Sequence, residues 1–357
     1  MSKLTIRARG LAAALLSLGA ATFSATACAQ ETLSDLIRSG QREAALAAIT
    51  SPDLDVNSAD PDGSTALLWA TYNIDHELVH ALLKAGARAN LTNHFGASPI
   101  GEAAKTGDAE ITRALLDAGA DPDSPNQDGQ TALMLAASVG APKVAELLIG
   151  RGANVNAVET FRGQTALMWA AAGNHPEVID VLVTHGADVK VRAKYDDWPR
   201  QMTSEPRAQF RQTGGLTALL YAARSGCYRC AVSIVKAGAD VNQPNPDGIT
   251  PLINAINNRS YDTAMFLLDK GASPGAWDMT GRTPLYVAVD MNSFKGGANN
   301  FGAPAEPNPQ SKATAMDVAN RLLTLGVDPN HELTRMRPNG TGAAASPTTC
   351  CAGARAR

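Results

Sequence analysis

Residues 131–136 read Thr-Ala-Leu-Met-Leu-Ala, and the phrase returns at 165–170 as Thr-Ala-Leu-Met-Trp-Ala. Related phrases begin at positions 65, 98, 217, 250 and 283, so successive copies lie 33, 33, 34, 52, 33 and 33 residues apart. A second phrase, typified by Gly-Ala-Asn-Val-Asn at 152–156, keeps step with the first. A fixed period of this length indicates a repeat architecture, in which each unit buries its apolar face against its neighbours.

Each period contains the signals for two short helices. The Thr or Ser that opens the phrase is a favourable N-cap, and the small Ala at its sixth place lets neighbouring helices approach closely. A second helix carries apolar pairs such as Leu82 and Leu83, and we expect the following Gly to end it in the left-handed conformation. Turns such as Asp62-Gly63 lead into the next unit. The alanines expected at the helix contacts are Ala70, Ala103, Ala136, Ala170, Ala222, Ala255 and Ala288.

This pattern resembles the ankyrin repeat, with seven copies in phase. The T-P-L-H-x-A signature of that family is only partly kept, because Leu68, Met134 or another residue replaces its histidine. The resemblance implies an all-α repeat solenoid of helix–turn–helix units with β-hairpin finger loops, in a bacterial and exported member of the family. We expect the repeat domain to span residues 30–340 with about eight repeats. The first, Leu33 to Asn57, is degenerate, with helices near 32–39 and 42–49.

Two insertions interrupt the period. The 52-residue spacing contains 19 extra residues near 195–213, placed in a finger and including Trp198 and Phe210. The second insertion, near 293–311, falls between the two helices of the last repeat and is rich in Gly, Asn and Pro. Long loops in compact arrays are usually functional or disordered. We expect the first insertion to contact a partner, because Trp, Phe and Arg are enriched in interface hot spots, and the second to be a flexible loop.

The resemblance also indicates where a partner would bind. Ligands of ankyrin proteins usually contact the fingers and the concave face of the inner helices, to which the residue before each conserved alanine should point. The alternative is that the aromatic rings there only cover the stems of neighbouring side chains. The predicted partner-binding residues are Trp69, Tyr72, Glu102, Lys105, Trp169, Tyr221, Arg224, Asn254 and Trp198.

The N-terminus has the layout of a secretory signal peptide. Basic residues precede an apolar run from Leu11 to about Phe23, and small residues follow. We predict cleavage after Ala29, which makes residues 1–29 a signal peptide and the protein periplasmic or secreted. Lipidation at Cys28 and a buried N-terminal helix are the alternatives. No later segment is long enough to span a bilayer.

Charge argues against nucleic acid as the main partner, and leaves a protein of unknown identity. The whole chain carries a net charge of −3, which becomes −6 without the three basic residues of the signal peptide. Hydrophobic residues make up 45% of the chain, enough for a continuous core. An acidic chain without a basic run lacks the electrostatic footprint of a nucleic-acid-binding protein.

Two short motifs suggest chemistry. Residues 76–80 read His-Glu-Leu-Val-His, which fits the H-E-x-x-H zinc motif, but the repeat register already explains Glu77 and Leu78. Cys227 and Cys230 form a C-x-x-C pair that fits a core cysteine beside a helix cap, a structural disulfide, or a redox pair. We predict no catalytic residue, metal or cofactor. The alternative function is a redox or small-molecule-binding accessory module that uses this cysteine pair.

The repeat pattern stops after Gly340. Residues 341–357 are rich in Ala and Arg and contain the adjacent Cys350 and Cys351, a composition typical of GC-rich DNA read in a shifted frame. A frameshift predicts that the downstream DNA encodes further ankyrin repeats. The alternative is a disordered tail that belongs to the protein.

Overall fold

The computed structural model describes residues 32–195, 214–293 and 311–330, and this part of the chain holds sixteen α-helices in eight consecutive pairs. The first helices of the pairs, called the inner helices, are α1 (Leu33–Arg38), α3 (Ala66–Tyr72), α5 (Pro99–Thr106), α7 (Ala132–Val139), α9 (Ala166–Ala172), α11 (Ala218–Ser225), α13 (Pro251–Asn257) and α15 (Pro284–Ser293). The second helices, called the outer helices, are α2 (Arg42–Ile49), α4 (His76–Lys84), α6 (Ala109–Asp117), α8 (Pro142–Gly150), α10 (Pro176–Thr184), α12 (Tyr228–Lys236), α14 (Tyr261–Asp269) and α16 (Ala315–Thr324).

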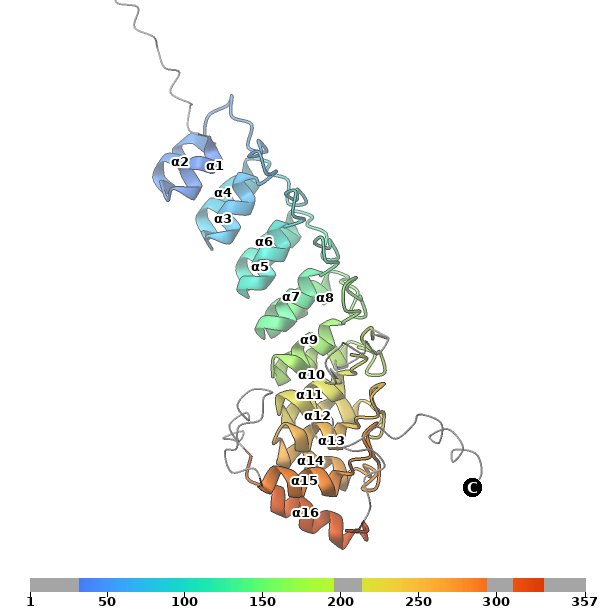
Figure 1. The fold of residues 1–357 in the computed structure, drawn as a ribbon. Coiled ribbons are helices and arrows are strands. Elements are labelled where there is room, and N and C mark those ends of the chain that lie inside the picture. Colours follow the sequence, from blue (N-terminus) through green and yellow to red (C-terminus); the bar gives the residue numbers. More distant parts are fainter. Residues whose placement is uncertain (1–31, 196–213, 294–310, 331–357) are drawn as a thin grey trace, which may run out of the picture. The chain divides into compact units, whose positions relative to one another are not determined.

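The helix pairs stack in chain order, as Figure 1 shows. Each inner helix packs against the next inner helix, each outer helix against the next outer helix, and the two helices of a pair against each other. The degenerate first repeat is present as α1 and α2, close to the helices that the sequence predicts. The signal peptide, Cys28, Trp198 with most of the first insertion, most of the second insertion, and the tail lie outside the described residues.

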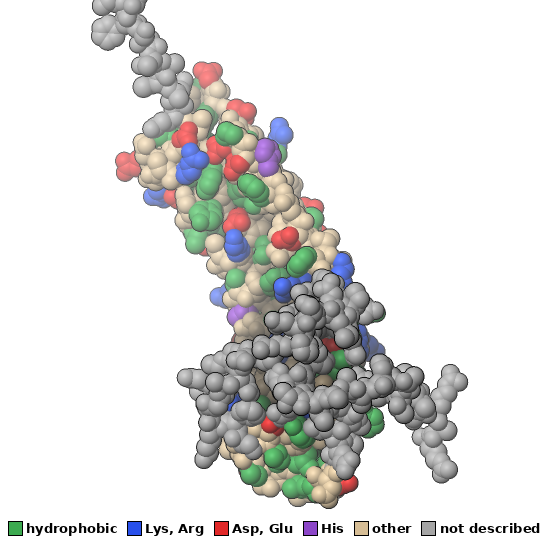
Figure 2. All heavy atoms as spheres, viewed as in Figure 1, with side chains coloured by type: hydrophobic (Ala, Val, Ile, Leu, Met, Phe, Trp, Pro, Cys, Tyr) green, Lys and Arg blue, Asp and Glu red, His purple; other side chains and the backbone are tan. Residues whose placement is uncertain are grey.

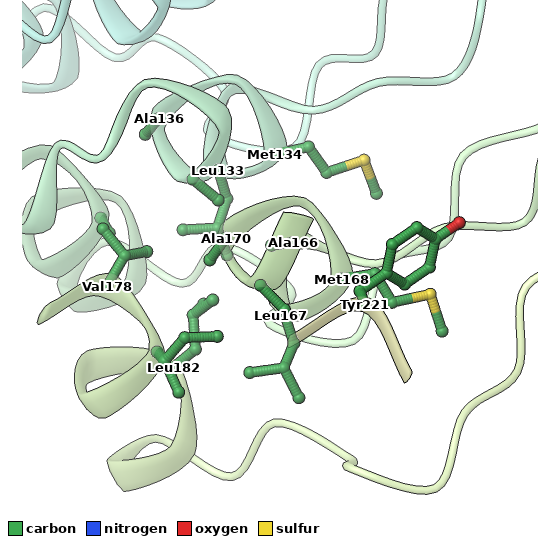
Figure 3. Close-up of a cluster of buried hydrophobic side chains, with 14 of the residues drawn as sticks. Leu133, Met134, Ala136, Ala166, Leu167, Met168, Ala170, Val178, Leu182 and Tyr221 are labelled. Atoms are coloured by element: carbon green, nitrogen blue, oxygen red, sulfur yellow. The ribbon is translucent and has the colours of Figure 1, made fainter. Parts of the chain in front are cut away.

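The conserved alanines lie at the centre of these contacts. All seven of them are fully buried, as the repeat pattern predicts. Figure 3 shows Leu133 and Ala136 of α7 close to Leu167 and Ala170 of α9. A methyl group at the sixth place leaves room for the leucines of both helices, and burying one leucine side chain stabilises the fold by about 1.5–3 kcal/mol.

Local signals set the helix ends. The hydroxyl of Thr65 accepts a hydrogen bond from the backbone N–H of Leu68, and most other inner helices begin in the same way. Thr131 is an exception, since its buried hydroxyl has no hydrogen-bond partner in the part of the chain that the structure describes. The Gly that follows each complete outer helix from α4 onward has a positive φ, for example 92° at Gly86. Apart from the one at Thr131, the predicted caps at 65, 98, 165, 217, 250 and 283 are therefore present.

The fingers, which join each outer helix to the next inner helix, are tighter than the β-hairpins that the resemblance implied. The described residues contain only isolated antiparallel bridges, Ala59 with Thr65, Arg192 with Thr217 and Tyr195 with Gly214. Each complete finger is closed by a backbone bond such as Asp60 N–H to Ser64 C=O at 2.8 Å. Asn and Asp side chains satisfy many of the remaining N–H groups of these turns, so no ladder of strands develops.

A row of asparagines links consecutive repeats. The side chain of Asn90 accepts from the N–H of Asp121 at 2.7 Å and donates to the C=O of Gly119 at 2.9 Å. Three asparagines at equivalent places make the same two bonds, namely Asn57, Asn156 and Asn242. Lys190 stands at this place in the repeat that carries the first insertion, and its side chain has no acceptor. The connection is therefore different where the first insertion leaves the array.

The two ends of the first insertion are held together. Ala193 N–H donates to Leu216 C=O at 3.0 Å, and Gly215 N–H donates to Lys194 C=O at 3.1 Å. The insertion therefore departs from the tip of a finger, where the sequence places it. In the sequence, the second insertion falls between α15 and α16.

Candidate functional site

Exposed aromatic side chains mark the fingers. Phe95 is 66% exposed, Phe161 75%, Tyr195 61% and Trp277 61%. On the face seen in Figure 2, hydrophobic side chains lie among acidic and basic ones over the N-terminal half of the array. Large exposed rings are not needed to close a turn, because other fingers have Asp or Pro at the equivalent positions of the repeat. The fingers therefore offer a surface rich in residues that favour protein contacts.

These fingertip aromatics were not among the predicted partner-binding residues. The prediction followed the inner helices, where the period fixes the register. A usable signal was present, since Phe95 directly precedes the turn residue Gly96 and Phe161 lies two residues before Gly163. Aromatic residues are uncommon at such turns.

The structure divides the predicted inner-helix residues into two groups. Trp69, Glu102 and Trp169 are half-buried at the surface, whereas Tyr72, Lys105 and Arg224 are exposed. Glu102 and Lys105 form an ion pair at 3.7 Å on one helix. Tyr221 and Asn254, by contrast, are only 6% and 8% exposed, so the expectation that they line an open face is wrong.

Hydrogen bonds between repeats explain the burial of this second group. The hydroxyl of Tyr221 accepts from Nε2 of Gln164 at 2.5 Å, and the guanidinium carbon of Arg224 lies 4.8 Å from the ring centre. Asn254 donates from Nδ2 to the C=O of Leu220 at 2.8 Å, which joins α13 to α11. Figure 3 shows the Tyr221 ring beside Met168, with its hydroxyl pointing away from the apolar interior. Both residues hold repeats together.

The two half-buried tryptophans of the inner helices differ in their surroundings. Trp69 donates from Nε1 to the carboxylate of Asp60 at 2.9 Å, and the Arg38 guanidinium lies 5.8 Å from its ring centre. Tyr72 meets the same ring edge-on at 6.0 Å. Trp69 is therefore held by an acceptor, a cation and a second ring.

Trp169 stands at the same place in its repeat but lacks these contacts within the described part of the chain. It lines a recess of about 390 Å³ together with Asp128, Gln130, Glu159, Phe161, Arg162 and Gln164. Its Nε1 is buried and has no hydrogen-bond partner among the described residues. The recess lies between two fingers that are joined by the bond from Thr160 N–H to Asp128 C=O at 3.0 Å.

The outer helices, by contrast, use much of their charge on one another. Arg42 pairs with Asp75 at 2.9 Å, Arg151 with Asp117 at 2.6 Å, Arg229 with Glu177 at 2.7 Å, and Arg321 with Asp269 at 3.1 Å. Each of these pairs joins neighbouring repeats. Exposed ion pairs contribute little energy individually, but they leave these charges engaged within the array.

The H-E-x-x-H residues take part in the same outer-helix network. His76 contacts Asp108 at 2.9 Å and Glu110 at 3.1 Å, and His80 lies 3.6 Å from Glu110. The hydrogen bond to Glu110 is the main cause that raises the pKa of His76, and the charge of Asp108 adds to it. Among the described residues, no group of three or more His, Cys, Asp or Glu side chains is placed to hold a metal ion.

Cys227 and Cys230 form a disulfide in this structure, with their Cα atoms 5.2 Å apart. The pair lies at the N-terminus of α12, and both side chains are buried. Burial keeps large reductants and protein thiols away from the sulfur atoms, because exchange requires access of the attacking thiolate. This geometry favours the structural reading of the C-x-x-C pair over the redox one.

None of the described helices is long and apolar enough to cross a bilayer.

Comparisons with known proteins agree with this architecture. The family model described as ankyrin repeats (3 copies) matches residues 27–126, 67–159, 100–193, 158–245 and 219–296. Among solved structures, the ankyrin repeat domain of Bcl-3, described as a unique member of the IkappaB protein family, matches with a TM-score of 0.51 and 23% identity. That match covers 65% of this chain and 99% of the other. No curated protein matches.

Ankyrin repeats are generally protein–protein interaction modules, and the family is one of scaffolds rather than of enzymes. Three observations indicate the same kind of repeat, namely the helix pairs, the buried alanines and the overlapping matches of the family model. This chain therefore belongs to the ankyrin repeat family.

Proposed function

We propose that this protein is a binding scaffold of the cell envelope that holds a partner protein against its fingers and inner helices. The observation that carries the proposal is the contrast between two surfaces. Exposed rings gather on the fingers, at Phe95, Phe161 and Tyr195, whereas outer-helix charges such as Arg151 and Arg229 are paired across repeats. A surface with exposed aromatic side chains gains most from a partner.

The architecture supports binding in a second way. Several neighbouring fingers are joined by backbone bonds, such as His94 N–H to Asp62 C=O at 2.8 Å and Met279 N–H to Asp247 C=O at 2.9 Å, and the side chain of Gln127 donates to the C=O of His94 between two others. A surface that is already ordered loses little conformational entropy when it binds. The fingers therefore form a preorganised surface rather than a set of independent loops.

Site-specific photo-crosslinking tests this surface. A photoreactive phenylalanine analogue at Phe95 or Phe161 should crosslink one and the same protein in cell-envelope extracts. The matched control carries the analogue at Glu146, an exposed position on the outer helix α8. Crosslinks to a common protein from Glu146, with none from the fingers, would place the binding surface on the opposite side of the repeats.

The location in the cell envelope rests on the N-terminal sequence. Lys3, Arg7 and Arg9 precede the apolar run, and small residues lead up to Ala29. Mass spectrometry of the protein recovered from the periplasm or the medium should find a mature chain that begins at Gln30. A chain recovered only from the cytoplasm with residues 1–29 still attached would refute export. A lipid attached to Cys28 would instead show that the protein is anchored.

A further inference from the structure

The recess beside Trp169 contains a buried hydrogen-bond donor for which the described residues provide no acceptor. The indole N–H of Trp69, at the equivalent place, donates to Asp60 in its own finger. The corresponding finger residue of the later repeat is Glu159, whose carboxylate accepts instead from the backbone N–H groups of Phe161, Arg162 and Gln164. This finger has one more residue than its counterpart, and its acid closes the turn. No described residue therefore accepts from the indole N–H of Trp169.

Two arginines near this donor lack carboxylate partners among the described residues. The guanidinium carbon of Arg162 lies 5.7 Å from the centre of the Phe161 ring, and that of Arg224 lies 4.8 Å from the centre of the Tyr221 ring. The two sites are adjacent, because Gln164 lines the recess and also donates to the Tyr221 hydroxyl. Stacking on a ring holds a guanidinium in place while its N–H donors stay available.

We propose that this place, called the Trp169 recess, binds an acidic segment of the partner protein. This inference rests on the proposed function and deepens it. A carboxylate of the segment pairs with Arg162 or Arg224, and an acceptor atom of the segment accepts a hydrogen bond from the indole N–H of Trp169. The exposed ring of Phe161 covers an apolar side chain beside the acid. Charge-assisted and bidentate bonds make guanidinium groups strong and specific receptors for carboxylates.

The charges of the array favour a peptide over a nucleic acid. The fingers and neighbouring turns on the N-terminal side of the recess carry a series of aspartates, among them Asp60, Asp62, Asp121 and Asp123. A polyphosphate backbone running along the fingers would meet this negative charge, whereas a short acidic segment needs only the local pair of cations. Two carboxylates, Asp128 and Glu159, line the recess itself. Glu159 accepts from three backbone N–H groups of its own finger, whereas Asp128 opposes an acidic ligand. Its removal should therefore strengthen binding.

Peptide selection on the full chain tests the proposal. Twelve-residue random peptides displayed on phage should, after selection on the wild-type protein, be enriched in Asp and Glu. Selected peptides should lose affinity on the order of tenfold for Arg162→Gln and again for Arg224→Gln, as expected when a hydrogen bond to a charged group is removed. The control Arg151→Gln, on the outer-helix surface, should leave the affinity unchanged, and Asp128→Asn should increase it.

The two tryptophans give a matched pair of variants. Trp169→Phe removes an unpaired donor, so it should weaken peptide binding and leave the unfolding midpoint unchanged or raised. Trp69→Phe removes the donor to Asp60, so it should lower the midpoint and leave peptide binding unchanged. A merely structural role of Trp169 would lower its midpoint as well.

Three results would overturn the proposal. These are selected peptides without acidic enrichment, affinities that do not respond to the two arginine variants, and displacement of the peptides by a single-stranded oligonucleotide at lower concentration than by free acidic peptide. The proposed function is judged separately by crosslinking. Crosslinks from Phe95 that persist in the double variant Arg162→Gln/Arg224→Gln, together with unresponsive peptides, would leave the scaffold standing and remove only the acidic segment.

Discussion

Three residues have a left-handed backbone conformation that ordinarily favours glycine. Each lies four positions after a conserved alanine, in the turn between an inner and an outer helix, where other repeats have Gly107, Gly140 and Gly226. The three exceptions are Ile74 with φ 55°, Asn174 with φ 60° and Arg259 with φ 57°. This conformation is least favourable for the β-branched Ile74, while Asn tolerates it.

The first prediction concerns this strain. Ile74→Gly should raise the free energy of unfolding by about 1 kcal/mol, because the left-handed conformation costs a β-branched residue about 1–2 kcal/mol and glycine nothing. The side chain of Ile74 is 45% exposed, so little burial is lost. Urea denaturation measures the change, and Asn174→Gly should give a smaller one. A loss of stability in Ile74→Gly would show that the side-chain contacts outweigh the strain.

The second prediction concerns pH. The pKa of His76 is raised, chiefly by its hydrogen bond to Glu110 and further by the charge of Asp108. The protonated form therefore stabilises the contact between α4 and α6. This contribution is fully present below the unfolded-state pKa of about 6.5 and is lost as the pH rises through the higher folded-state pKa.

Denaturation midpoints at pH values from about 6 to 8 test this linkage. The stability difference between the wild type and His76→Gln should shrink as the pH rises, because the variant cannot be protonated at this position. Using the difference removes the contributions of the other histidines. A difference that stays constant over this range would contradict the assignment.

The sequence predicts the structural position of a residue when that residue recurs in every repeat, and does so less well when it does not. The alanines, the Thr caps and the glycines recur every repeat, so the spacing alone predicts the places of Ala136 and Gly86. Tyr221 was misplaced because its burial depends on Gln164, which reaches it from another repeat. The N–H of Trp169 is unpaired within the described residues because the carboxylate of Glu159 accepts hydrogen bonds from backbone N–H groups instead. The spacing of residues in the sequence does not reveal which donors bind this carboxylate.

The outer helix α12 differs from the other described outer helices because it contains a disulfide. Cys227 caps this helix and is bonded to Cys230 in its first turn, so the disulfide closes a loop of only a few residues. In the chain-entropy model, a loop this short stabilises the folded state by about 2 kcal/mol. The disulfide should therefore stabilise α12 without being essential for the fold.

The third prediction follows from this small loop. Reduction with dithiothreitol should lower the free energy of unfolding by about 2 kcal/mol, as measured by urea denaturation. The double variant Cys227→Ala/Cys230→Ala serves as the control, and its stability should not respond to dithiothreitol. A response that persists in this variant would assign the effect to the other cysteines, Cys28, Cys350 and Cys351.

The fingers show how the resemblance and the structure differ at the level of elements. The family pattern implied β-hairpins, but bonds such as Asn93 Oδ1 with the N–H groups of Phe95 and Ala97 satisfy the turn locally. A finger closed in this way presents its tip residue outward, which explains the exposure of Phe95. The prediction of a partner surface on the fingers is therefore best tested at these tips.

Across the whole array, different parts of each repeat make different kinds of contact. Side chains on the outer helices bind one another between repeats, the alanines and leucines bind the helices together, and the fingers retain exposed rings and cations. The central claim is that a partner protein covers the fingers and the inner helices and leaves the outer helices open.

Hydrogen–deuterium exchange of the protein, alone and with the partner captured by crosslinking, tests this claim most directly. We expect slower exchange in the fingers at 93–97, 126–130 and 159–164 and in the inner helices α7 and α9. Exchange in the outer helices α4, α6 and α8 should not change. Slower exchange confined to the outer helices, with the fingers unaffected, would contradict the account.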